Sequence, residues 1–170
     1  MHISQQYAER FFDIMSRDEV TKYYGMDSLA NPEEAARIIE SFQTSFELKR
    51  GIRWGLILKE NGRFIGTIGL NNLNVRGKKA EVGYKLHPDY WGQGLVREAN
   101  SAVLQYAFTE LDLFRIGAVT FPENTASSGL LKKLGFIEEG RLRGYLYQRH
   151  QSHDALVFSL LKTEWEKKVN

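Results

Sequence analysis

The stretch 85-KLHPDYWGQGLVREA-99 decides how the centre of this chain folds. A β-like run ends at His87–Pro88, and Gly92 and Gly94 then open directly into a helical pattern. The first backbone N–H groups of a helix have no partner within the helix and lie at the positive end of its dipole, so a glycine corner there is either a flexible turn or a site for phosphate groups. The motif alone leaves both readings open, because a Walker loop needs a following Gly-Lys-Ser/Thr and the dinucleotide fingerprint needs a third glycine where Arg97 stands.

The composition of the chain excludes several classes of site. The 170 residues include no cysteine, which rules out disulfides, thiolate metal sites and a cysteine nucleophile, and the 4 histidines show no metal-ligand spacing. A net charge of +2, spread along the chain, does not indicate a nucleic-acid surface. There is no apolar run of about 18 residues that would span a membrane, and the start, MHISQQYAERFF, lacks the pattern of a signal peptide. We therefore expect a cytoplasmic protein without a metal.

Apolar periodicity and turn residues predict the order of the elements. Helices are expected from Ser4, over residues 17–25 and over 31–49, followed by strands at 52–60, 63–73 and 80–88, with an Asn-Gly hairpin turn between the first two. After the glycine corner we expect a helix at 94–111, a strand at 114–121, a helix at 122–135 and two strands at 136–148 and 154–165. This order predicts a single α+β domain, 1–170, with a mostly antiparallel sheet, helices on both faces and a parallel β–α–β step around residues 80–121.

Periodicity also predicts the faces of two elements at the centre of the chain. Strict alternation in the strand at 80–88 places Glu81 and Lys85 on one face and Tyr84 on the other. In the helix at 94–111 the expected apolar stripe consists of Ala99, Ala102, Val103, Tyr106 and Ala107.

Two motifs resemble those of a known family. The segment EVGYKLHPDYWGQGLVREA, residues 81–99, resembles the acetyl-CoA-binding segment of the GNAT N-acetyltransferases, whose pattern Q/R-x-x-G-x-G/A falls here on Trp91, Gly94 and Val96. The first and last positions depart from that pattern. ENTASSGLLKKLGF, residues 123–136, is similar to the later family motif N-x-x-S/A followed by G-F, and with the C-terminal segments it looks most like the Rim-type branch, which acetylates N-terminal amines of ribosomal proteins.

The resemblance implies a fold and a set of cofactor-binding residues. It implies a GNAT-like sheet of about six strands, whose usual N-terminal edge strand is missing or vestigial because only MHI precedes the first helix. Acetyl-CoA would be the cosubstrate. Its thioester and pantetheine would lie against the backbone of Lys85, Leu86 and His87, its pyrophosphate against the amides of Gly92, Gln93, Gly94, Val96 and Arg97, and its pantetheine also against Asn124. By residue preference alone Asn124 is a plain helix N-cap, and Trp91 either covers the cofactor or packs the loop.

The resemblance also implies catalytic roles. Glu81 matches a strand position where several family members carry their general base, although a surface carboxylate is the plain alternative. The position at which many members carry a tyrosine acid is Leu131 here, so Ser127 is the candidate to hydrogen-bond the leaving thiolate, unless its hydroxyl is satisfied in the first turn of its helix. Tyr23 and Tyr24 belong either to an acceptor-site lid or to helix packing.

Together these features predict direct acetyl transfer onto a primary amine, without a covalent enzyme intermediate. The acceptor is a protein N-terminus of the ribosomal-protein type or a small molecule such as a polyamine, an aminoglycoside or an amino-acid-like amine. A non-catalytic acyl-CoA-binding module is the alternative of a different class. We expect a monomer or homodimer, with no nucleic-acid or membrane partner.

Overall fold

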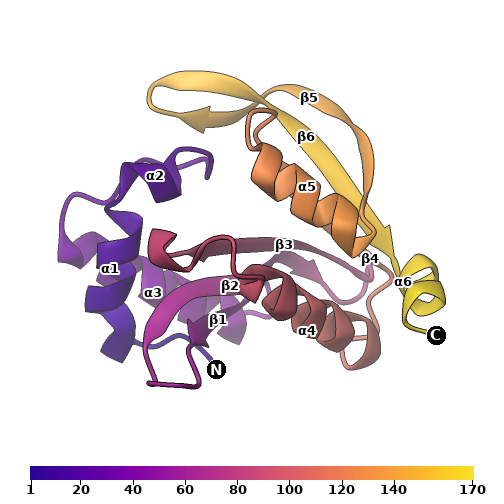
Figure 1. The fold of residues 1–170 in the computed structure, drawn as a ribbon, viewed down its shortest axis with the longest axis horizontal. Helices are drawn as coiled ribbons and strands as arrows, with labels where there is room; N and C mark the ends of the chain where they lie inside the picture. Colours follow the sequence, from indigo (N-terminus) through magenta and orange to yellow (C-terminus); the bar gives the residue numbers. More distant parts are fainter.

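The computed structural model describes residues 1–170 and is built around one six-stranded sheet in the order β1-β2-β3-β4-β6-β5 (Figure 1). Its strands are β1 (Ile52–Ile57), β2 (Phe64–Asn74), β3 (Lys79–Leu86), β4 (Arg115–Thr120), β5 (Ile137–Gln148) and β6 (Gln151–Leu161). Every neighbouring pair is antiparallel except β3 and β4, which are parallel. The predicted α+β class, strand number and central parallel step are confirmed.

Helices cover both faces of this sheet, as predicted. They are α1 (Ala8–Met15), α2 (Asp18–Thr21), α3 (Pro32–Glu47), α4 (Leu95–Thr109), α5 (Thr125–Leu134) and α6 (Lys162–Val169), with short 3₁₀ turns at Gln5–Tyr7 and Pro88–Tyr90. One buried cluster joins α4 and α5 to β2, β3, β4 and β6, and a second joins α1 and α3 to Phe64 of β2. In Figure 1, α4 and α3 accordingly lie on opposite sides of the sheet. No helix is both long enough and apolar enough to cross a bilayer.

The N-terminal residues form only a remnant of an edge strand. Met1 accepts a hydrogen bond through its carbonyl from the N–H of Gly55, at 2.8 Å, and a single β-bridge joins His2 to Trp54. No seventh strand results, so the expectation of a vestigial first strand is confirmed.

The parallel pairing of β3 with β4 is short. It lasts for three register positions, Lys79 with Arg115, Ala80 with Ile116 and Glu81 with Gly117, and then stops while β3 continues to Leu86. Beyond Glu81 the two central strands therefore separate, and each has an edge that no neighbouring strand covers.

Two sequence predictions were wrong in part: the end of the last strand, and the apolar stripe of α4, of which Val103 and Ala107 are buried as expected. The predicted last strand ends at Leu161, where the Glu164 side chain accepts the Leu161 N–H at 2.9 Å and starts α6. This cap turns the amphipathic KTEW segment away from the sheet. The buried face of α4 consists of Asn100, Val103, Leu104, Ala107 and Phe108, while Ala102 and Tyr106 are exposed. The polar Asn100 is only half satisfied on that face: its amide nitrogen donates to the Val96 carbonyl at 2.9 Å, while its amide oxygen is buried without a partner.

Candidate functional site

A cleft of about 970 Å³ opens where β3 and β4 separate. Its walls come from α2 and the residues after it, the end of β3, the corner before α4 and the first turns of α5. Nine of the predicted site residues line it: Lys85, Leu86, Gly92, Gln93, Gly94, Val96, Arg97, Asn124 and Ser127. Glu81 and His87 do not.

The glycine corner leaves open space beside unpaired amides. Gly92 and Gly94 have φ values of +72° and +78°, and a Cβ added to either would meet no protein atom within 4 Å. Gly94 is the N-cap of α4 and offers no side-chain cap, and the N–H of Glu98 is the first to bond back to the Gly94 carbonyl. The preceding amides of the first turn therefore point, without helical partners, into a space that protein does not fill. This geometry suits an anion better than a packed turn.

Asn124 has the capping role that residue preference predicted. Its Oδ1 accepts the N–H of Ser127 at 3.3 Å, which starts α5. The side-chain nitrogen of Asn124 has no partner in the chain and lines the cleft, so capping leaves it available as a donor.

A pair of hydroxyl groups crosses the gap between β3 and α5. The Tyr84 hydroxyl lies 2.7 Å from Ser127 Oγ. Burial raises the pKa of Tyr84, and the hydrogen bond from Ser127 lowers it by less, so the phenol stays protonated near neutral pH. Sequence reasoning assigned Ser127 but missed Tyr84, although its position on the face opposite Lys85 follows from strand alternation.

Trp91 fixes the corner to the end of β3. Its indole Nε1 donates to the Leu86 carbonyl at 2.8 Å, while 48 % of the residue remains exposed. This contact matches the loop-packing role that the sequence left open for Trp91.

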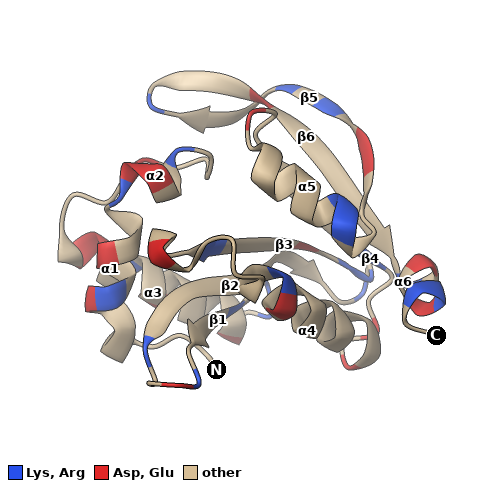
Figure 2. Ribbon diagram, viewed as in Figure 1, with Lys and Arg blue, Asp and Glu red and all other residues tan.

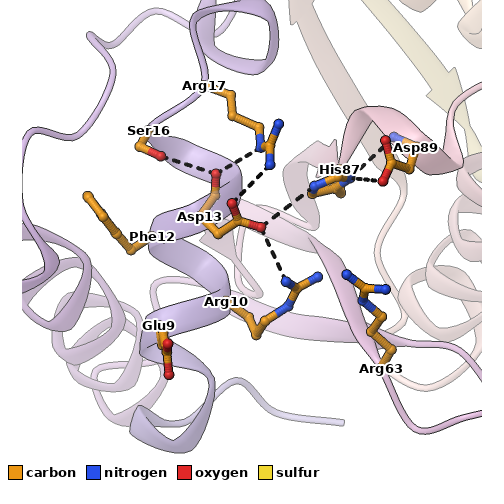
Figure 3. Close-up of a pocket in the computed structure, with 9 residues that line it drawn as sticks. All are labelled: Glu9, Arg10, Phe12, Asp13, Ser16, Arg17, Arg63, His87 and Asp89. Carbon is orange, nitrogen blue, oxygen red and sulfur yellow. Dashed lines mark hydrogen bonds and ion pairs between the residues drawn. The ribbon is translucent and has the colours of Figure 1, made fainter.

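His87 lies on the other side of this corner, in a second cavity of about 600 Å³ (Figure 3). Its buried ring sits between Asp13 of α1 and Asp89, with Nε2 3.6 Å from Asp13 Oδ2 and Nδ1 accepting the Asp89 N–H at 3.2 Å. Its backbone is also paired, because its N–H donates to Ile65 and its carbonyl accepts from Tyr90. His87 therefore anchors the corner to α1 and does not face the cleft.

Glu81 occupies the narrow end of the gap. It is the last residue of β3 that pairs with β4, and its Oε2 accepts a hydrogen bond from Asn72 Nδ2 at 3.2 Å. It is partly exposed and lies outside the cleft lining.

The Lys85 side chain is the feature that the sequence reasoning missed. Lys85 is only 6 % exposed, and its Nζ lies 3.5 Å from the centroid of the Tyr24 ring, in a cleft that both residues line. Arg53 of β1 is buried beside them and donates to the Gly83 carbonyl at 2.9 Å and to Asn71 Oδ1 at 2.6 Å. Alternation identified the face of Lys85, but not that α1 and the segment after α2 bury it.

Two further basic side chains line the cleft. They are Arg97 in the first turn of α4 and Lys133 in the last turn of α5, and Figure 2 shows blue segments at the start of α4 and at the end of α5. Among all its lining residues the cleft has one acid, Glu19, against four bases, Lys22, Lys85, Arg97 and Lys133. A diphosphate bound at the corner would be stabilised by both Arg97 and Lys133.

Comparison with known proteins gives the family. The family model described as the acetyltransferase (GNAT) domain matches residues 2–137. The chain belongs to the GNAT acetyltransferases. It is 43% identical over 160 residues to the uncharacterized N-acetyltransferase YoaA of Bacillus subtilis (strain 168), covering 94% of this chain and 90% of that protein. It is 32% identical to the putative ribosomal N-acetyltransferase YdaF of the same organism, covering 94% and 88%.

The fold of this GNAT acetyltransferase also matches solved structures. Spermidine N-acetyltransferase from Vibrio cholerae, solved in complex with CoA and spermine, superposes with a TM-score of 0.86 over 98% of this chain and 96% of that chain. At 19% identity this likeness concerns the fold alone. The unpaired corner amides, the open space beside Gly92 and Gly94 and the two basic helix ends all fit a CoA diphosphate.

Proposed function

We propose that this GNAT acetyltransferase is a cytoplasmic, Rim-type enzyme that moves the acetyl group of acetyl-CoA onto the α-amine of a protein N-terminus. The observation that carries the proposal is the single cleft in which an anion-binding corner and a buried, cationic inner end meet. The similarity to YdaF, a putative ribosomal N-acetyltransferase, points to the same class of acceptor.

The residues of the cleft divide between the two ends of the cosubstrate. The amides of Gly92, Gln93, Gly94, Val96 and Arg97 would hold its pyrophosphate, and Asn124 Nδ2 would donate to its pantetheine. The edge of β3 that faces the gap at Lys85 and Leu86 would pair with the pantetheine as an added strand, beside the Leu86 carbonyl that also accepts Trp91 Nε1. The paired N–H and carbonyl of His87 limit its part to shaping the corner. Acetyl-CoA, when bound, supplies the thioester carbonyl that the amine attacks.

Charge favours an N-terminus over a polyamine. The inner end of the cleft holds Lys85 with Arg53 behind it, and Glu19 is the only acid among the lining residues. A polyamine carries several positive charges, and their repulsion from these cations would weaken its binding. A peptide N-terminus has one charge, which it loses before reaction.

Two groups would serve the proton and thiolate chemistry. Ser127, held by the protonated Tyr84, would hydrogen-bond the sulfur as it leaves. Glu81 would act at the narrow end of the gap through water, because its carboxylate lies outside the cleft lining.

The Glu81→Gln variant is expected to lower kcat about tenfold, which is less than the roughly 100-fold or more that a directly placed general base contributes, because Glu81 acts at a distance through water. Its affinity for acetyl-CoA should stay unchanged, because no corner residue contacts Glu81. Steady-state kinetics over a range of pH, with isothermal titration of acetyl-CoA, measure both quantities. Equal kcat for wild type and variant at every pH would remove Glu81 from the mechanism.

The proposed function is tested by CoA release from acetyl-CoA in the presence of N-terminal peptides, spermidine, an aminoglycoside and free amino acids. We expect peptides with a free α-amine to give the highest kcat/KM, and the same peptides with a blocked N-terminus to give none. Preference for a small amine would replace the N-terminal assignment. Binding of acetyl-CoA without turnover on any amine would favour a non-catalytic module.

A further inference from the structure

Burial and a neighbouring cation oppose the positive charge of Lys85, while two aromatic rings favour it. The side chain is almost fully buried, and its Nζ is 3.5 Å from the centroid of the Tyr24 ring and 5.7 Å from that of Phe11. The charged or titratable groups that act on it are Tyr24 and Arg53, and no carboxylate is among them. A buried lysine next to a second cation and without an acidic partner is the arrangement that makes lysines reactive as bases or nucleophiles.

Burial is the main cause that lowers the pKa of Lys85 to about 8, with the Arg53 guanidinium lowering it further and Tyr24 opposing both. For Tyr24, burial alone would raise the pKa, but the positive charges of Lys85 and Arg53 outweigh it and lower the pKa. Both groups therefore move toward the pH at which enzymes act, and both line the cleft. Among the side chains that line the cleft, only that of Lys85 is both buried and placed next to Tyr24 and Arg53.

We infer that Lys85 Nζ is the general base that takes the proton from the attacking amine, with Arg53 and Tyr24 as the residues that tune and position it. The inference rests on the proposed function. In the step, the amine nitrogen forms its bond to the thioester carbonyl carbon and the carbon–sulfur bond breaks. The proton leaving the nitrogen goes to the lone pair of Lys85 Nζ and passes from there to water, while the thiolate, hydrogen-bonded by Ser127, takes a proton from water. Glu81 then has only the distant role given above.

The assignment also explains the class of amine. An α-amino group has an ordinary pKa of about 7.7–8.0, whereas a lysine-type or polyamine nitrogen titrates near 10.4. A base with a pKa of about 8 accepts a proton from an α-amino group at almost no free-energy cost. To take one from a lysine-type or polyamine nitrogen it must overcome a difference of more than two pKa units. Lys85 thus favours protein N-termini for a chemical reason, and the positive charge of Arg53 behind it adds an electrostatic one.

Two substitutions separate a base from a mere positive charge. Lys85→Met removes both the charge and the base, and Lys85→Arg keeps the charge but cannot give up a proton near neutral pH. If Lys85 is the base, both variants should lose about 100-fold in kcat on an N-terminal peptide. Their dissociation constants for acetyl-CoA should change less than threefold. Lys167→Met, an exposed lysine on α6, is the matched control and should retain wild-type kinetics.

Stability is checked on the same proteins. Because the pKa of Lys85 is depressed in the folded chain, its charge destabilises the fold fully well below pH 8, and this cost disappears as the pH rises to the unfolded value of 10.5. Lys85→Met is therefore expected to melt no lower than wild type at neutral pH. A loss of activity in this variant then reports on catalysis and not on unfolding.

A second readout needs no acceptor and no turnover. Competitive labelling of lysine amines by trace acetic anhydride, followed by peptide mass spectrometry across pH, should give a midpoint near 8 for Lys85 and an ordinary midpoint for Lys167. Retained activity in Lys85→Arg, or a Lys85 midpoint equal to that of Lys167, would overturn the inference. If wild type acetylates no amine, the proposed function has failed, and the base role fails with it even when the Lys85 midpoint is near 8. If wild type acetylates N-terminal peptides but the Lys85 midpoint equals that of Lys167, only the assignment of the base has failed.

Discussion

Gly94→Val is expected to weaken acetyl-CoA binding by at least about 100-fold. A β-branched residue at a φ of +78° is strained by roughly 1–3 kcal/mol, and the chain relieves that strain by turning the corner away from its present conformation. The new side chain would also project into the space that protein leaves empty beside the first amides of α4. Since each tenfold loss of affinity corresponds to 1.4 kcal/mol, strain and steric exclusion together account for two orders of magnitude. Isothermal titration measures the change.

Gly62→Val is the matched control for this experiment. Gly62 has a φ of +69° and an equally open surrounding, but it lies in the exposed turn between β1 and β2. The control should lose a similar amount of stability while binding acetyl-CoA as wild type does. Equal affinities in both variants would show that the corner does not hold the diphosphate.

Gln148→Leu is expected to lower the free energy of unfolding by about 2–4 kcal/mol, because it leaves one buried and one half-buried backbone group without partners. Gln148, at the end of β5, is 3 % exposed. Its Oε1 accepts the N–H of Gly25 at 3.0 Å, and its Nε2 donates to the Thr21 carbonyl at 2.7 Å. The side chain thereby ties the β5–β6 hairpin to the segment that carries Tyr24.

The same variant should also raise KM for the acceptor several-fold, because Tyr23 and Tyr24 lose the contact that positions them, while the affinity for acetyl-CoA is preserved. Chemical denaturation and steady-state kinetics give the two values. Gln105→Leu, on the exposed side of α4, is the control and should change neither. Unfolding at the same denaturant concentration as wild type would show that water replaces both lost hydrogen bonds.

Local patterns predicted the frame of the molecule well. The Asn31–Pro32 start of α3 and the Gly135 end of α5 are short-range signals, and the structure has both: Asn31 Oδ1 accepts the Glu34 N–H at 3.1 Å, and Gly135 is the C-cap of α5 with a φ of +98°. The helices expected to stop at Gly25 and Gly51 end earlier, at Thr21 and Glu47. The corner at Gly92 and Gly94 was recognisable because its geometry depends on a few consecutive residues. The start of α6 was not recognised, because KTEW fits a strand as well as a helix until the Glu164 cap decides.

The inner end of the cleft depends on contacts between distant segments. Alternation places Lys85 on a known face of β3, but whether that face meets water or side chains depends on how α1 and the residues after α2 pack. Tyr24, Arg53 and Lys85 are far apart in sequence, and only the folded chain brings them together. Tyr84 and Ser127 meet across the gap for the same reason.

Because β3 and β4 pair at only three register positions, the sheet consists of two halves that separate beyond this short seam. The seam joins them at one end, and Gln148 with the Arg149 N–H, which donates to Asp27 at 2.9 Å, joins them at the other. The gap between the halves is bordered by two strand edges, and apart from the Leu86 carbonyl, which accepts Trp91 Nε1, no neighbouring strand covers them. A ligand with amides of its own, bound as proposed, would complete the sheet as well as occupy a site. Such a ligand would then also stabilise the folded state, by joining the two halves.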